Sequence, residues 1–153
     1  MARRTRDRIT GAAAALALLL SGAPAAAIPA PAPTPFGLEK AGWTLITASE
    51  DTYVYMRPAQ PTASGVRRVW TAYDSDSSRD RQGFSFRSVE SLSEFDCRKN
   101  LTRVVEELFH AGPGLTGPTW RMPNFIPTDW AVPAPGSVGA IRMAFACKTL
   151  ADA

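Results

Sequence analysis

The sequence predicts an α+β fold in which one antiparallel sheet carries one helix across a face. Three observations predict it. Short β-rich runs separated by turn-forming residues fill the first two thirds of the folded part. A nearly all-apolar helical segment follows near the C-terminus, and an apolar helix must be buried against something. Cys97 and Cys147 lie at the end of a predicted strand and in the last turn of that helix, so a disulfide would tie the two together.

Composition suits one small globular domain. The chain has 153 residues, 45% of them hydrophobic, with 17 Lys and Arg, 14 Asp and Glu, and 13 Pro. The formal net charge of +3 comes from four arginines and one aspartate within residues 3–8, which leaves the rest of the chain balanced. Bulk electrostatic attraction to nucleic acid or to anionic lipid is therefore not expected.

Residues 1–27 have the features of a signal peptide. The arginine cluster precedes an apolar stretch, residues 11–20, and small residues ending in an A-x-A site at residues 25–27, so the mature chain would begin at Ile28. A membrane anchor is the alternative, but Pro24 and the short apolar core argue against it. The position that would need a cysteine for lipidation is Ala23. We expect an exported protein without a lipid anchor.

Export favours oxidation of the two cysteines. Cys97 and Cys147 are the only pair in the chain, and a lone pair in a small exported domain is usually a disulfide. Metal binding by this pair is disfavoured because the chain has a single histidine and no C-x-x-C motif.

Residues 28–42 are predicted to be a Pro/Ala-rich linker. Proline occupies every second position near its start, which favours an extended, polyproline-like spacer. The folded domain is expected to begin near Trp43 and to span residues 43–149.

Within that domain, local patterns predict a meander of short strands. The predicted strands are residues 43–48, 53–56, 66–73, 83–89 and 92–97, and residues 74–81 are predicted to be a polar loop.

The remainder of the domain gives less uniform signals. Apolar residues between Leu101 and Phe109 follow helical spacing, so local pattern favours a helix there. Residues 113–135 are proline-rich and predicted to be mostly loop. Ser137 can cap a helix over residues 138–148.

Several segments together resemble the surface-adhesin protein E family over about residues 43–148. They are Trp43, residues 66–70, residues 85–88, Asp96 with Cys97, Gly112 to Gly114 with Gly117, Trp130, residues 135–137, and Cys147 with Lys148. The resemblance implies about six antiparallel strands, with the C-terminal helix held on the concave face by the disulfide. It also implies that residues 98–109 form a strand, against the local helical pattern.

The resemblance implies a function as well. Its best known member is a bacterial surface protein that binds host matrix and plasma proteins such as laminin, vitronectin and plasminogen, and it forms dimers. A homodimer and a protein ligand are thus implied here, with no nucleic acid and no cofactor. This chain lacks the lipidation cysteine that would hold an adhesin at an outer membrane, and in this it differs from a surface-anchored adhesin. We therefore keep a periplasmic sensing or scaffolding protein of the same fold as an alternative.

No catalytic residue is predicted. His110 is the only imidazole, and neither a positioned nucleophile nor a G-x-S-x-G motif accompanies it. Glu106 and Glu107 are adjacent, which is poor placement for paired acid and base work.

Metal and binding sites are only weakly signalled. Asp74, Asp76 and Ser78 begin an EF-hand-like spacing that then fails, so no metal site is predicted. Arg67 and Arg68 beside Trp70 could form a contact patch, but strand alternation puts one arginine on each face. Trp43, Trp70 and Trp130 are expected to pack structurally. Trp120, in the proline-rich region, is the tryptophan expected to be exposed, and the binding residues stay unassigned.

Overall fold

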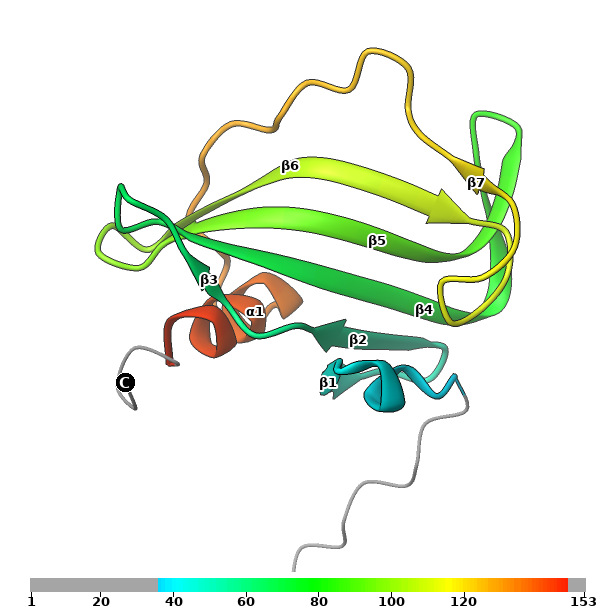
Figure 1. Ribbon diagram of the computed structural model, residues 1–153, viewed down its shortest axis with the longest axis horizontal. Coiled ribbons are helices and arrows are strands. Elements are labelled where there is room, and N and C mark those ends of the chain that lie inside the picture. Colours follow the sequence, from blue (N-terminus) through cyan, green and yellow to red (C-terminus); the bar gives the residue numbers. More distant parts are fainter. Residues whose placement is uncertain (1–35, 149–153) are drawn as a thin grey trace, which may run out of the picture. The chain divides into compact units, whose positions relative to one another are not determined.

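A computed structural model describes residues 36–148 of the protein (Figure 1). The predicted signal peptide, residues 1–27, and the polyproline-like part of the linker, residues 28–35, lie outside the described residues. No helix within residues 36–148 has the length and apolar character needed to cross a membrane.

The described chain forms one antiparallel sheet with a C-terminal helix, as predicted. The strands pair in the order β1-β2-β4-β5-β6-β7, and β3 pairs with β4. Their bounds are β1 Thr44–Ala48, β2 Thr52–Met56, β3 Gln60–Pro61, β4 Arg67–Arg81, β5 Phe84–Asp96, β6 Leu101–His110 and β7 Thr119–Trp120. Every pairing is antiparallel, so the meander expected from the sequence is confirmed.

The predicted polar loop at residues 74–81 was wrong. This segment continues β4, and the two strands predicted at residues 83–89 and 92–97 are one strand, β5. The two long strands are joined at Gln82 and Gly83, which both have positive φ, at 52° and 81°. Such a tight turn allows a polar segment to extend as a two-stranded hairpin, because its backbone groups pair across the strands without needing a buried face.

Residues 101–110 form β6, so the local helical prediction for this segment was wrong. The strand implied by the family resemblance over residues 98–109 is confirmed from residue 101, and residues 98–100 belong to the turn after β5. The register explains the misleading pattern. Leu92 pairs with Glu106 and Ser93 with Val104, so Val105 is an extra residue in the strand. A bulge shifts the alternation of side chains by one position, and the apolar residues on either side of it no longer follow a period of two.

The helix α1, Val138–Lys148, has the predicted bounds. The Ser137 hydroxyl accepts a hydrogen bond from the Ala140 N–H at 3.2 Å, which confirms the predicted cap. Met143 and Ala146 are buried against one face of the sheet, with the side chains Met56, Val69 and Phe95. We call this the helix-bearing face. Figure 1 shows α1 beneath one part of the sheet, near β3.

The disulfide joins Cys97, just after β5, to Cys147 in the last turn of α1, with the two Cα atoms 5.7 Å apart. It therefore attaches the helix covalently to the strand on which it packs.

The opposite face has its own core. The short 3-10 helix η1, Leu38–Ala41, places Leu38 with Trp43, Tyr55 and Ala72. The Phe36 ring lies edge-on to Tyr53, with centroids 5.4 Å apart. Residues 36–42 thus fold against the sheet, upstream of the start expected near Trp43.

Removing the disulfide should destabilise the domain strongly. Closing a loop between residues 50 positions apart restricts the unfolded chain and is worth about 4 kcal/mol in the loop-entropy treatment. We expect the double variant Cys97→Ser, Cys147→Ser to lose free energy of unfolding of about that size in urea titrations. Thiol titration of the denatured, unreduced protein should find no free thiol. Two free thiols, or equal stability of the two proteins, would contradict the disulfide's role.

Candidate binding pocket

A pocket lies on the helix-bearing face, beyond the part that α1 covers. Tyr73, Val89 and Phe109 are neighbours across β4, β5 and β6, so they point to the same side of the sheet. Tyr73 shares that side with Val69 of the helix-bearing core, four residues earlier on β4. These three side chains belong to the floor of the pocket.

The β4–β5 hairpin supplies the walls. Pairing between β4 and β5 shifts register between Asp74 and Arg79, and such an irregularity bends the strands. Figure 1 shows the hairpin end turned away from the rest of the sheet, near β7. The pocket has a volume of about 190 Å³ and is lined by Thr52, Tyr73, Asp74, Ser75, Arg79, Arg81, Phe86, Arg87, Val89, Glu107 and Phe109.

Aromatic rings fix the hairpin against β6 and β7. Phe86 lies edge-on to the buried Phe109 at 5.0 Å between centroids, and Trp120 contacts the Phe109 ring at 5.4 Å. Trp120 also stacks on Phe84 at 6.0 Å. Trp120 was expected to be exposed, but it is half-buried in this cluster because β7 pairs with β6. It packs structurally and holds one wall of the pocket.

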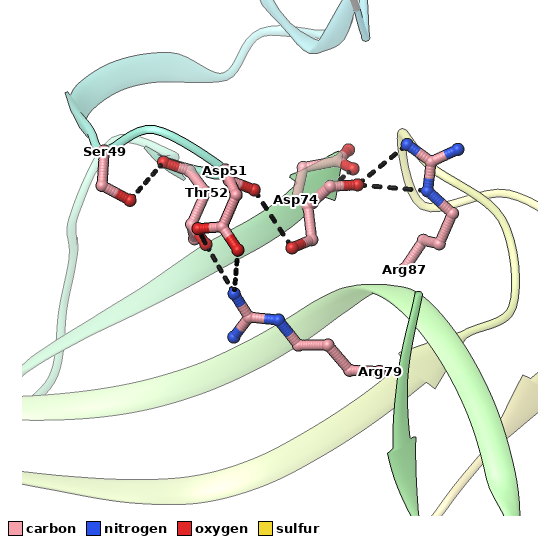
Figure 2. A network of polar contacts seen from close by, with 7 residues as sticks. Ser49, Asp51, Thr52, Asp74, Arg79 and Arg87 are labelled. Atoms are coloured by element: carbon pink, nitrogen blue, oxygen red, sulfur yellow. Dashed lines mark hydrogen bonds and ion pairs between the residues drawn. The ribbon is translucent and has the colours of Figure 1, made fainter. Parts of the chain in front are cut away.

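Three arginines line the pocket, and neighbouring groups orient two of them (Figure 2). The Arg87 Nε and Nη2 atoms donate to the Ser75 carbonyl oxygen at 3.1 and 2.9 Å. The Arg79 Nη2 atom donates to the Thr52 hydroxyl at 2.7 Å and lies 3.3 Å from an Asp51 carboxylate oxygen. Both partners of that ion pair are about half exposed, so solvent screens it.

The third arginine, Arg81, has its guanidinium 5.3 Å from the centre of the Phe109 ring. Within residues 36–148, neither Arg81 nor Arg87 forms an ion pair. Against these arginines the pocket holds one carboxylate, that of Glu107, because the side chain of Asp74 points to the opposite face of the sheet beside Ser88. The pocket therefore combines excess positive charge with an aromatic wall.

Asp74 fastens a distant loop to the face of the sheet opposite the pocket, where Leu115 packs beside the second core. Its side chain is fully buried, and its carboxylate accepts hydrogen bonds from the Gly114 N–H at 2.5 Å and the Ser75 N–H at 3.0 Å. Burial raises the pKa of Asp74 to about 6, although the two N–H groups and the charge of Arg87 act in the opposite direction. Because Asp74 lies in a strand and both its oxygens are occupied, the EF-hand-like spacing with Asp76 and Ser78 does not form a metal loop.

Arg142 of α1 adds a buried positive charge between the helix and the sheet, next to the pocket residue Tyr73. Its side chain is 8% exposed, and its guanidinium lies 5.7 Å from the Tyr73 ring centre and 5.5 Å from that of Phe95. One nitrogen donates to the Ser93 hydroxyl, while the Nε atom is buried without a hydrogen-bond partner. Burial lowers the pKa of Arg142, and the nearby Tyr73 and Glu107 act against that shift.

The residues considered for catalysis do not come together. His110 follows Phe109 on β6 and so points to the other face, where it is buried and neither ring nitrogen has a partner. Burial lowers the pKa of His110. Opposite His110, the Ser88 hydroxyl donates to the Gly112 carbonyl and accepts from the Leu115 N–H, so its hydrogen bonds are structural.

Glu106 and Glu107, whose adjacency is poor placement for paired acid and base work, face opposite sides of β6. Glu107 lines the pocket, whereas Glu106 forms an ion pair with Arg121. Within the described chain, no three His, Cys, Asp or Glu side chains are grouped so as to hold a metal ion.

The remaining candidates also serve the sheet. Arg67 is buried, and Arg68, on the other face, forms an ion pair with Glu94 at 2.8 Å. The expected single patch of two arginines beside Trp70 does not form. Trp43 is buried and Trp70 packs beside the second core, as expected. Trp130, which was also expected to pack structurally, is exposed, and its ring lies 4.6 Å beneath the Arg103 guanidinium.

Asp74 should give the domain a measurable pH dependence. In the unfolded chain this carboxyl ionises near its ordinary pKa of 3.8, whereas in the folded protein it ionises near 6. Between these values the folded state binds more protons, so the contribution of Asp74 to stability falls as pH rises from about 4 to 6 and is constant above.

The test compares urea unfolding of the protein and of Asp74→Asn at pH 4 to 8. The advantage of the natural protein over the variant should shrink between pH 4 and 6 and then level off. The control is Ser77→Ala, an exposed position on the same strand, which removes no titratable group and should leave the step at Asp74 unchanged. Parallel curves for the natural protein and Asp74→Asn would contradict the account.

Comparison with known proteins gives one finding. No curated protein and no solved structure matches the chain. A family model described as surface-adhesin protein E matches residues 43–148, which includes every strand of the sheet and the helix α1. The match also contains both cysteines, the three arginines that line the pocket, and Arg142. The chain belongs to the surface-adhesin protein E family.

Proposed function

We propose that this protein is exported and acts at the cell surface by binding other proteins, without catalysis. The observation that carries the proposal is the family match, which spans nearly the whole described domain. Membership in a family of surface adhesins implies export and a surface location. The finer part of the proposal is the ligand class, which we take to be host matrix or plasma proteins.

The chemistry of the described side chains supports a binding role. Cys97 and Cys147 are joined in the disulfide, and the Ser88 hydroxyl serves the fold. The pocket offers cations and aromatic rings, which recognise charged and apolar groups of a partner. A homodimer, implied by the resemblance, stays part of the proposal and would present two such pockets.

The first test locates the protein. Intact cells are treated with an external protease, and the culture medium is assayed in parallel with an antibody against the folded domain. We expect the protein to be removed by the protease or found in the medium. A variant lacking residues 2–27 should be protected inside the cell and controls for lysis.

A protein that stays protected until the outer envelope is breached would contradict the surface role. It would support the periplasmic alternative, which Ala23 favours because no lipid can be attached at that position. Given surface exposure or release, the purified exported protein should bind at least one of immobilised laminin, vitronectin and plasminogen. Binding to none of them would overturn the host-protein proposal.

A further inference from the structure

We propose that the pocket between the β4–β5 hairpin and the helix-bearing face binds an acidic side chain, together with a neighbouring apolar side chain, of a partner protein. This inference rests on the proposed function, because it assigns the contact surface and the chemistry of the partner. It concerns Arg81 and Arg87 above all, with Arg142 behind them.

The first step is the unbalanced charge. Arg81 and Arg87 form no ion pair with any residue in 36–148, while Arg79 has a screened, half-exposed one. A guanidinium has five N–H donors in a planar fork that suits a carboxylate. Arg87 uses two of its N–H groups on the Ser75 carbonyl, so the other donors stay available to an incoming anion.

The second step is preorganisation. The two hydrogen bonds to Ser75 hold the Arg87 guanidinium in the pocket before any ligand arrives, and the Phe109 ring supports that of Arg81. Ordering a long side chain on binding costs roughly 0.5 to 1.5 kcal/mol, and this cost is reduced where the fold already holds the side chain.

The third step is the buried charge next to the pocket. Arg142 is more than nine-tenths buried, its Nε atom has no partner, and its guanidinium lies over Tyr73, which lines the pocket. Burying a cation without an ion pair is costly, and within residues 36–148 Arg142 forms none. Its positive field reaches the pocket through a medium that screens it less than water does.

The fourth step is the choice of anion. Phe86, Phe109 and Val89 give the pocket an apolar side, and Glu107 places one negative charge in it. A polyanion without an apolar group would be repelled by Glu107 and would leave the apolar side of the pocket without a contact. An acidic residue beside an aromatic or aliphatic one satisfies the arginines and the rings together, and a volume of about 190 Å³ suits one or two side chains.

The experiment uses a pair of short peptides and the full exported protein. The acidic probe is acetyl-Gly-Glu-Phe-Gly-amide, and its uncharged match has Gln in place of Glu. Calorimetry should give the acidic peptide a Kd on the order of 1 mM, which suits so small a ligand, and the Gln peptide an affinity at least tenfold lower. Added salt should weaken the acidic peptide's binding.

The protein variants are matched in charge. Arg81→Gln with Arg87→Gln should lower the affinity for the acidic peptide at least tenfold. Arg98→Gln with Lys99→Gln removes the same charge from the exposed turn between β5 and β6, and it should leave the affinity within twofold. If the first double variant fails to fold, Arg81→Gln alone is used, because its described contact is with one ring.

Three results would overturn the inference: equal binding of the two peptides, equal loss in both double variants, or competition by inorganic phosphate as strong as by the acidic peptide. The last result would mean a site for small anions that does not select a protein side chain.

The inference and the proposed function can fail separately. If the protein binds matrix or plasma proteins but not the peptide, the function stands and the pocket is not its contact surface. If the peptide binds in the pocket but no such protein does, the pocket stands and the ligand class is wrong.

Discussion

The position of α1 determines which part of the helix-bearing face is covered and which part is left open to form the pocket. The disulfide between Cys97 and Cys147 attaches α1 to the end of β5, so the helix buries Met143 and Ala146 on one part of the helix-bearing face. Eleven residues span only about 16 Å in a helix, which is too short to cover strands of 13 and 15 residues. The rest of that face meets solvent, and the pocket forms there.

Arg142 connects the core to the pocket. Sequences that specify one fold usually keep unpaired charges out of the interior, and exceptions tend to occur at functional sites. Here the guanidinium lies between the rings of Tyr73 and Phe95, so cation–π attraction and one hydrogen bond to Ser93 replace part of its hydration. The same placement puts a positive charge behind the pocket floor, where solvent screens it less than at the surface.

The sequence predicted the parts of the fold that local chemistry determines. The helix bounds, its Ser137 cap and the turn-separated strands all follow from residue types within a few positions, and the disulfide follows from the expectation of export together with the cysteine count. The pairing of residues 74–81 could not be predicted this way, because these polar side chains resemble a loop and only the turn at Gly83 joins the strands. The strand β6 could not be recognised from local pattern, because the bulge at Val105 interrupts the alternation of apolar and polar side chains. The pocket arginines are scattered along the hairpin, and only the bend of β4 brings them beside Phe109.

The central claim is that an anionic group binds beside Arg81 and Arg87, and the most direct measurement observes the arginine side chains themselves. Nuclear magnetic resonance of the arginine Nε–Hε groups, assigned by single Arg→Lys variants, would be followed while the acidic peptide is added. The account predicts that the signals of Arg81 and Arg87 shift with the same saturation curve, while that of Arg98 stays fixed. Shifts at Arg98 as large as those in the pocket, or none at Arg81 and Arg87, would contradict it.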